Sequence, residues 1–195
     1  MYRLILIVGS LRNLSQHKIA LAVACAITLL SVGAQSPALA DEVKCGILKN
    51  ASVSLREAIE SALAKYEGFP VKAELKEQDD MYYYEINLVS EGGRSEVFVN
   101  PANGLEIGFQ QENGVAVRFQ RFWESKLGAI LAANISLLQA IETAQETHQG
   151  FVSEVELKSR REPHIFEILL LDGEVEREVT IDAKKGKIIN VEIDD

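Results

Sequence analysis

Hydrophobic and polar positions follow the same order in two parts of the chain. Residues 53–62 place apolar side chains at the i, i+3, i+4 spacing of one helix face, and residues 135–144 repeat the pattern 82 positions later. Ser54 and Ser136 stand directly before these stretches, each followed three positions later by Glu or Gln. That spacing is typical of a capping box. We therefore expect each copy to begin with an amphipathic helix of about thirteen residues that ends before a glycine.

The segments after each helix alternate between apolar and polar residues, which predicts half-buried strands. In the first copy these segments are residues 71–76, 82–89, 95–100 and 105–109, and in the second they are residues 153–158, 164–171, 177–182 and 188–193. Turn signals rich in Gly, Asn and Asp separate them. Consecutive strands joined by short turns form antiparallel meanders. The predicted fold class is α+β, with two repeats that each pack one helix on an antiparallel meander of three to four strands.

The two copies align without a gap, and about a third of the positions over roughly fifty-five residues are identical. This divides the chain into a leader at 1–40, a first repeat at 41–110, a connector at 111–133 and a second repeat at 134–195. We expect the first repeat to open with a short polar lead-in at 41–51. In the connector we expect a strand at 115–119 and a helix or helical turn at 122–131. A repeat this small buries little core, so two copies should share an interface or extend one sheet.

The first 40 residues have the features of a secretory signal peptide. Residues 3–18 contain two arginines, one lysine and one histidine but no acidic residue. An apolar run follows at 19–34, and the cleavage site is predicted after Ala40. Two alternatives stay open, namely retention as an N-terminal anchor and lipoprotein-type cleavage at Cys25. We expect a periplasmic or secreted protein without stable membrane insertion after cleavage.

The charge excludes some partners. Three of the 20 basic residues and none of the 29 acidic residues lie in the leader, so the rest of the chain carries 17 basic and 29 acidic residues, a net charge of −12. Such an acidic protein is a poor ligand for nucleic acids or anionic membranes. Cys45 is the one cysteine after the leader, so no internal disulfide is possible there. We expect Cys45 to be an incidental thiol in a mobile segment, with an intermolecular disulfide as the alternative.

One string of residues occurs in both copies and resembles the PepSY domain, which is found in propeptides of thermolysin-type metallopeptidases and in many exported bacterial proteins. The string is Ser-Leu-x-x-Ala-Ile, Gly-Phe, Glu-Ile inside a strand, and Glu-Val followed seven positions later by Gly. The first copy departs from the family's usual turn, with residues 100–104 reading Asn-Pro-Ala-Asn-Gly. The resemblance implies a helix on an antiparallel sheet, an extracytoplasmic location, binding and restraint of a peptidase, and no catalytic residues. Since no peptidase domain follows in this sequence, we expect a partner in trans.

No catalytic, cofactor or metal motif is visible, and we expect a protein that is not an enzyme. His148 and His164 lie outside any metal-ligand spacing and align with Tyr66 and Tyr82, which favours a packing role. No glycine-rich phosphate loop, serine elbow or His-Glu-x-x-His string is present.

The candidate partner-binding residues are polar or aromatic positions on strands and in the connector. Glu85 and Glu167 occupy equivalent strand positions on the face predicted to be away from the helix, where a solvated charge or a cross-strand ion pair is the alternative. Tyr83 alternates away from Tyr82 and Tyr84, and is expected to be exposed. Phe122 and Trp123 either pack between the halves or form a recognition patch.

The expected function is binding or restraint of a secreted or periplasmic peptidase, held at a sheet edge or by surface complementarity. The alternative is an envelope protein that senses a small ligand or a metal through the groove between the two repeats.

Overall fold

The helices that open the two repeats form where the capping pattern predicts them. The computed structural model describes residues 37–90, 93–112, 117–159 and 162–194. Ser54 caps α3 (Leu55–Leu63) and Ser136 caps α5 (Leu137–Thr147), and both capping boxes are complete. The helices contain 9 and 11 residues, fewer than the pattern predicts. α3 ends at Leu63 and α5 at Thr147, so each helix stops several residues before its glycine, Gly68 or Gly150.

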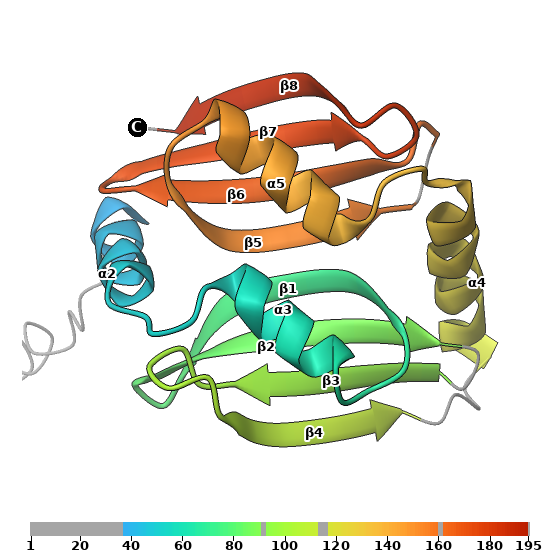
Figure 1. Ribbon diagram of the computed structural model, residues 1–195, viewed down its shortest axis with the longest axis horizontal. Coiled ribbons are helices and arrows are strands. Elements are labelled where there is room, and N and C mark those ends of the chain that lie inside the picture. Colours follow the sequence, from blue (N-terminus) through green and yellow to red (C-terminus); the bar gives the residue numbers. More distant parts are fainter. Residues whose placement is uncertain (1–36, 91–92, 113–116, 160–161, 195) are drawn as a thin grey trace, which may run out of the picture. The chain divides into compact units, whose positions relative to one another are not determined.

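The eight strands predicted within the two repeats are present, and in the described residues they form one sheet (Figure 1). The first repeat contributes β1 (Phe69–Gln78), β2 (Met81–Ser90), β3 (Gly93–Val99) and β4 (Glu106–Glu112). The second contributes β5 (Phe151–Lys158), β6 (Ile165–Asp172), β7 (Val175–Asp182) and β8 (Lys187–Asp194). The order is β4-β3-β2-β1-β5-β6-β7-β8, with antiparallel neighbours throughout. The α+β class is therefore confirmed.

The two repeats meet at β1 and β5 and are related by a local twofold axis. Ala73 pairs with Val155, the residue 82 positions later, and Lys72 pairs with Glu156 on one side of this centre as Glu74 pairs with Glu154 on the other. This symmetric register extends one sheet through both repeats. Of the two arrangements expected for the tandem, the continuous sheet is the one observed, and it leaves β4 and β8 as the two edges.

Helices α3 and α5 lie side by side across one face of the sheet (Figure 1). Their apolar stripes include Leu55 and Ile59 on α3 and Leu137 and Ile141 on α5, all buried. These stripes pack on the alternate strand residues that face them, in a single hydrophobic cluster that spans both repeats. Burial of this shared core is the main reason why the two copies are stable as a pair.

Two further helices precede the repeats; the sequence pattern missed the first, and it predicted the second only for residues 122–131. Residues 41–49, expected as a polar lead-in, belong to α2 (Pro37–Lys49), and the connector forms α4 (Val117–Ala132). The expected strand at 115–119 is wrong for residues 117–119, which are helical, while residues 115 and 116 lie outside the described residues. In Figure 1, α2 and α4 lie at opposite ends of the central strands.

The helices α2 and α4 are themselves a repeated element. Lys44-x-Gly46 on α2 recurs as Lys126-x-Gly128 on α4, again 82 positions later. α2 contacts β5, β6 and β7 of the second repeat, and α4 contacts β2 of the first repeat as well as β5. α2 thus packs on the repeat that it does not precede, and α4 packs on strands of both repeats, so both helices tie the two halves together.

The leader predicted at 1–40 lies almost entirely outside the described residues, and α2 spans its predicted end. Among the described helices, none alone has the length and apolar composition to cross a membrane. Ser125–Ala132 and α5 would meet those criteria together, but the two segments are bent by 62° relative to each other.

Candidate functional site

The sheet face opposite α3 and α5 carries a network of ion pairs across β2, β1, β5 and β6. Lysines at three strand positions each bridge two carboxylates, with N–O distances of 2.8–3.1 Å. The bridges are Lys72 with Glu74 and Glu154, Lys76 with Glu74 and Glu85, and Lys158 with Glu156 and Glu167. Because Lys72 aligns with Glu154 in the repeat, one of these pairs links equivalent positions across the twofold axis.

Two of the candidate partner-binding residues belong to this network. Glu85 forms an ion pair with Lys76 at 3.1 Å and accepts a hydrogen bond from Asn87 at 3.0 Å. The residue is 8% exposed. Glu167 pairs with Lys158 at 3.0 Å and is less buried. The cross-strand pairing that was the alternative reading is therefore present at both positions. Of the two alternatives for Glu85, a solvated charge is therefore excluded, because its neighbours cover the carboxylate.

The geometry also bears on acid–base chemistry. Glu85 lies on β2 and Glu167 on β6, so three strand spacings, about 14 Å, separate their strands. Carboxylates that share a proton or flank a reacting bond lie much closer together. These two glutamates therefore do not form a catalytic pair.

Lys126 of α4 reaches this face and is buried there, with 3% of its surface exposed. Its Nζ lies 3.0 Å from Glu156 Oε1 and donates a hydrogen bond to the Leu157 carbonyl. Burial lowers the pKa of Lys126, and its pair with Glu156 only partly offsets that effect. Burial disfavours ionisation of Glu156 as well, but hydrogen bonds from Lys158 and Lys126 outweigh it and lower the Glu156 pKa. This pair anchors α4 on the sheet.

An aromatic groove lies near the outer margin of the first repeat. Tyr83 packs against Phe98 in an edge-to-face arrangement, with ring centroids 5.7 Å apart. The rings line a cavity of about 380 Å³ together with side chains of β4 and of the β1–β2 turn. Gly108 lies opposite Phe98 in the β3–β4 register, and a Cβ there would approach Phe98 Cδ2 to 3.1 Å. The glycine therefore leaves the groove open toward the edge of the sheet.

A second cavity, of about 270 Å³, lies between the repeats on the side of α3. It is lined by the end of α2, the start of α3, Gln145 of α5, and Phe151 and Val152 of β5. Glu57 already accepts the Ser54 N–H at 2.7 Å, so the N-terminus of α3 is occupied by its own capping box. This cavity corresponds to the groove expected between the copies.

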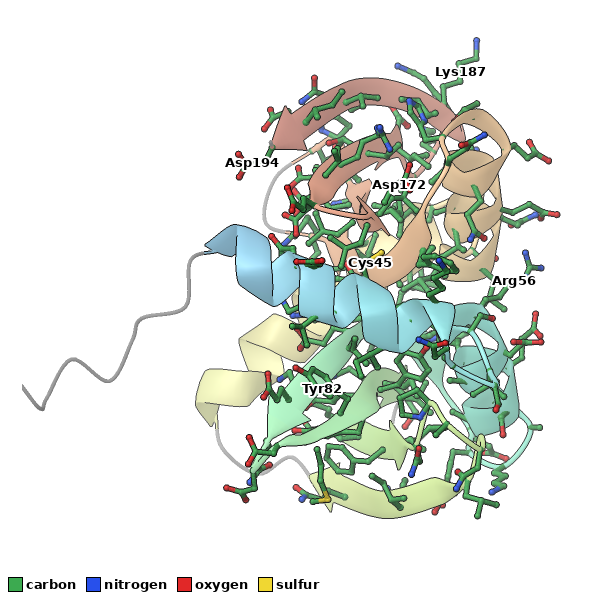
Figure 2. The ribbon with its side chains drawn as sticks, turned by 90° about the vertical axis from the view of Figure 1, so that its left-hand side faces the viewer. Cys45, Arg56, Tyr82, Asp172, Lys187 and Asp194 are labelled. Carbon is green, nitrogen blue, oxygen red and sulfur yellow. The ribbon has the colours of Figure 1, made fainter. Side chains whose placement is uncertain are left out.

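Cys45 is buried on α2, in contrast to the mobile position expected for it. The Gly173 N–H donates a hydrogen bond to Cys45 Sγ at 3.2 Å, and the thiol faces the Leu171 carbonyl at 3.9 Å. Figure 2 shows its sulfur against the second repeat, near Asp172. The 82-residue repeat aligns Cys45 with Leu127 of α4, an apolar position, so extension of the repeat toward the N-terminus would have indicated its burial.

The remaining candidate contact residues lie on α4, and one histidine lies just before a strand of the second repeat. Phe122 and Trp123 lie on α4, but their side chains are outside the described residues. His164 has a buried Nδ1 without a hydrogen-bond partner among the described residues. In that same part of the chain, no three His, Cys, Asp or Glu side chains gather as metal ligands would.

Sequence reasoning missed Phe98, Ile107, Gly108 and Lys126. Strand alternation could have placed Phe98 and Tyr83 on one face, and extension of the 82-residue repeat toward the N-terminus could have marked Lys126. The groove itself depends on the pairing of β3 with β4, which includes a register shift at Phe98.

Comparison with known proteins identifies the family. The model of the PepSY family, described as the peptidase propeptide and YPEB domain, matches residues 52–108 and 134–192, which together are more than half of the chain. The chain belongs to the PepSY family and contains two copies of its domain. Each match leaves out the preceding helix, α2 or α4, so the structural repeat is longer than the family's domain.

Two solved structures resemble the chain at low identity. One is a candidate lipoprotein of Clostridium difficile 630, with 18% identity, a TM-score of 0.46, and coverage of 76% of this chain and 97% of the other. The second is the C-terminal domain of YpeB from Bacillus megaterium, with 17% identity, a TM-score of 0.26, and coverage of 75% and 67%. No curated protein sequence matches the chain.

Proposed function

We propose that this protein is an exported, non-enzymatic binding protein that holds or restrains a secreted or periplasmic peptidase. The observation that carries the proposal is that the chain contains two copies of a domain whose family is named for peptidase propeptides. Propeptides of this kind act by binding, which requires an exposed complementary surface instead of a reactive group. The predicted signal peptide supports a location outside the cytoplasm.

The sheet supports this function in a physical way. Its two edge strands, β4 and β8, pair on one side only among the described strands, so each presents backbone donors and acceptors to an incoming segment. The charged network in the middle of the open face is internally paired and is a weaker candidate for contact, because its charges are already satisfied. Tyr83 is the predicted contact residue that lies beside a groove.

Affinity capture tests the proposal. The full chain, expressed with its own leader, serves as bait in envelope and secreted fractions of the native cell. We expect enrichment of one peptidase whose activity falls when purified chain is added. A version with Phe122→Ala and Trp123→Ala tests whether α4 contributes to the contact. Capture that contains no peptidase, or a captured peptidase whose activity does not change, contradicts the proposal.

The second candidate function is small-ligand sensing through the cavity between the repeats. The observation that favours it is the cavity of about 270 Å³ where α2, α3 and α5 approach β5. A thermal-shift screen of metals and small molecules distinguishes the two. Stabilisation that is abolished by Gln145→Trp, which would fill the cavity, supports sensing, and no shift with any compound counts against it.

A further inference from the structure

The two edges of the sheet differ in chemistry although they are equivalent in the repeat. On β4 the interior residues 107–111 read Ile-Gly-Phe-Gln-Gln and carry no charge. On β8 the corresponding stretch, residues 189–193, reads Ile-Asn-Val-Glu-Ile and carries the interior charge of Glu192. Both strands have charges at their ends, Glu106 and Glu112 on β4 and Lys187 and Asp194 on β8, so the difference lies in the interior. Charged side chains on an edge strand discourage pairing with another chain. β4 is thus the edge that is less protected against an added strand.

The aromatic groove opens beside β4 and has no counterpart of the same chemistry at β8. Where the first repeat has Tyr83, Phe98 and Gly108, the second has Ile165, Thr180 and Asn190. Asn190 also donates a hydrogen bond to Glu192, so a polar pair occupies the position that is open at Gly108. The second repeat therefore lacks both the aromatic floor and the glycine that gives access to it.

The groove is apolar at its floor and acidic at its end. Ile107 is 57% exposed beside Phe98, and Met81 is also exposed. Asp79 lines the groove, and Asp80 follows it in the β1–β2 turn, where both residues have positive φ of 51° and 62°. Neither carboxylate has a hydrogen bond or ion pair to another described residue, and no lining residue is basic. A bound segment that carries both an apolar and a basic side chain would complement the apolar floor and the acidic end of the groove.

We propose that β4 is the docking edge and that it binds an extended segment whose side chains on one face alternate between apolar and basic. This inference deepens the proposed binding function, on which it rests. The segment would add an antiparallel or parallel strand to β4. Its apolar side chain would pass over Gly108 onto the ring of Phe98, and a Lys or Arg beside it would face the acidic end of the groove, which Asp79 lines. A second copy of this acidic chain fits less well, because it would bring further carboxylates to the same place.

Two pairs of variants test the assignment in the full chain. Ile107→Lys places a cation in the groove, and Ile189→Lys is its matched control at β8, where Ile189 is 51% exposed. Gly108→Asn installs the residue of the second repeat and obstructs the groove without a charge, while Asp79→Asn removes the carboxylate and keeps a side chain that tolerates positive φ. Thermal unfolding of each variant verifies that the fold is retained.

The probe is a short peptide with Thr at every second position and with Lys, Leu and Lys, in that order, at the positions between. The control peptide, its acidic twin, has Glu in place of each Lys. Fluorescence anisotropy should show the basic peptide binding at least about tenfold more tightly than the acidic twin, with an advantage that shrinks in high salt. Ile107→Lys and Gly108→Asn should weaken binding about tenfold, Asp79→Asn should weaken it less, and Ile189→Lys should have no effect. Hydrogen exchange should show new protection in β4 and not in β8.

Several outcomes would overturn the assignment. These are equal loss with Ile107→Lys and Ile189→Lys, tighter binding of the acidic twin, or β4 amides that are already protected in the free chain. Failure of this inference can be told apart from failure of the proposed function. If the chain captures and restrains a peptidase but the Ile107→Lys variant does so equally well, the function stands and the β4 assignment is wrong.

Discussion

The buried ion pair between Lys126 and Glu156 makes a quantitative prediction about what holds α4 on the sheet. At 3.0 Å and an effective dielectric of about 20, the attraction amounts to roughly 5–6 kcal/mol. Burial of the ammonium costs several kcal/mol in lost hydration, so the net contribution of the pair is small. Removal of the carboxylate alone keeps the cost of burial and loses most of the attraction. Removal of the lysine loses both.

The two single substitutions should therefore have very different effects. Glu156→Gln should lower the free energy of unfolding by about 3 kcal/mol, the lower end for a broken buried pair because the amide oxygen can still accept a hydrogen bond. Lys126→Met should change stability by less than about 1 kcal/mol or increase it, since Glu156 keeps its pair with Lys158 at 2.8 Å. Urea unfolding followed by circular dichroism measures both.

Glu74→Gln is the matched control, because Glu74 is the residue equivalent to Glu156 in the first repeat. Its partners, Lys72 and Lys76, are 27% and 38% exposed, so its loss should cost under about 1 kcal/mol. If Glu156→Gln costs no more than Glu74→Gln, or if Lys126→Met is the more damaging change, the reasoning about burial is refuted.

The acid dependence provides a second check on the same pair. The Glu156 pKa is lowered in the folded chain, so the carboxylate stabilises the fold above its ordinary value of 4.5. That stabilisation is lost as the pH falls through the lowered folded-state pKa. The difference in stability between wild type and Glu156→Gln should shrink across this acidic range. A difference that stays constant would contradict the lowered pKa.

Three further predictions concern the core and the repeated helices. Burial raises the pKa of Tyr84 to about 12, so this tyrosine should resist ionisation in an absorbance titration until the fold is lost. Ionisation of Tyr84 near pH 10 in the folded chain would contradict its burial. Ser54→Ala and Ser136→Ala should each lower the free energy of unfolding by about 1 kcal/mol in urea titrations, and a cost at one cap alone would break the equivalence of the repeats. Cys45 should react slowly with a thiol reagent in the native chain and rapidly in urea, whereas rapid native reaction would show that α2 is not docked.

The fold was largely predictable because local signals and the repeat agree. The capping serines fixed the starts of both helices, and the alternation along β2 and β6 placed Tyr84 and Phe166 toward the helices. The helix α2 was not recognised, since residues 41–51 look polar when read alone. Their apolar side, Cys45 and Leu48, becomes evident only when the repeat is extended to α4.

The candidate site was harder to predict because it depends on pairing between strands. Alternation correctly placed Glu85 away from the helices, but it could not show that Lys76 would cover the carboxylate. The groove was not foreseeable for the same reason. It arises where Gly108 falls opposite Phe98, and that register is set by an irregularity in the β3–β4 pair.

Peptidase activity in the native cell tests the central claim most directly. Envelope and secreted fractions are compared between cells that contain the chain and cells that lack it, with the wild-type, Ile107→Lys and Ile189→Lys chains each returned to the deletion strain. We predict higher peptidase activity without the chain, restoration of restraint by wild type and Ile189→Lys, and no restoration by Ile107→Lys. Equal peptidase activity with and without the chain would contradict the claim that it restrains a peptidase.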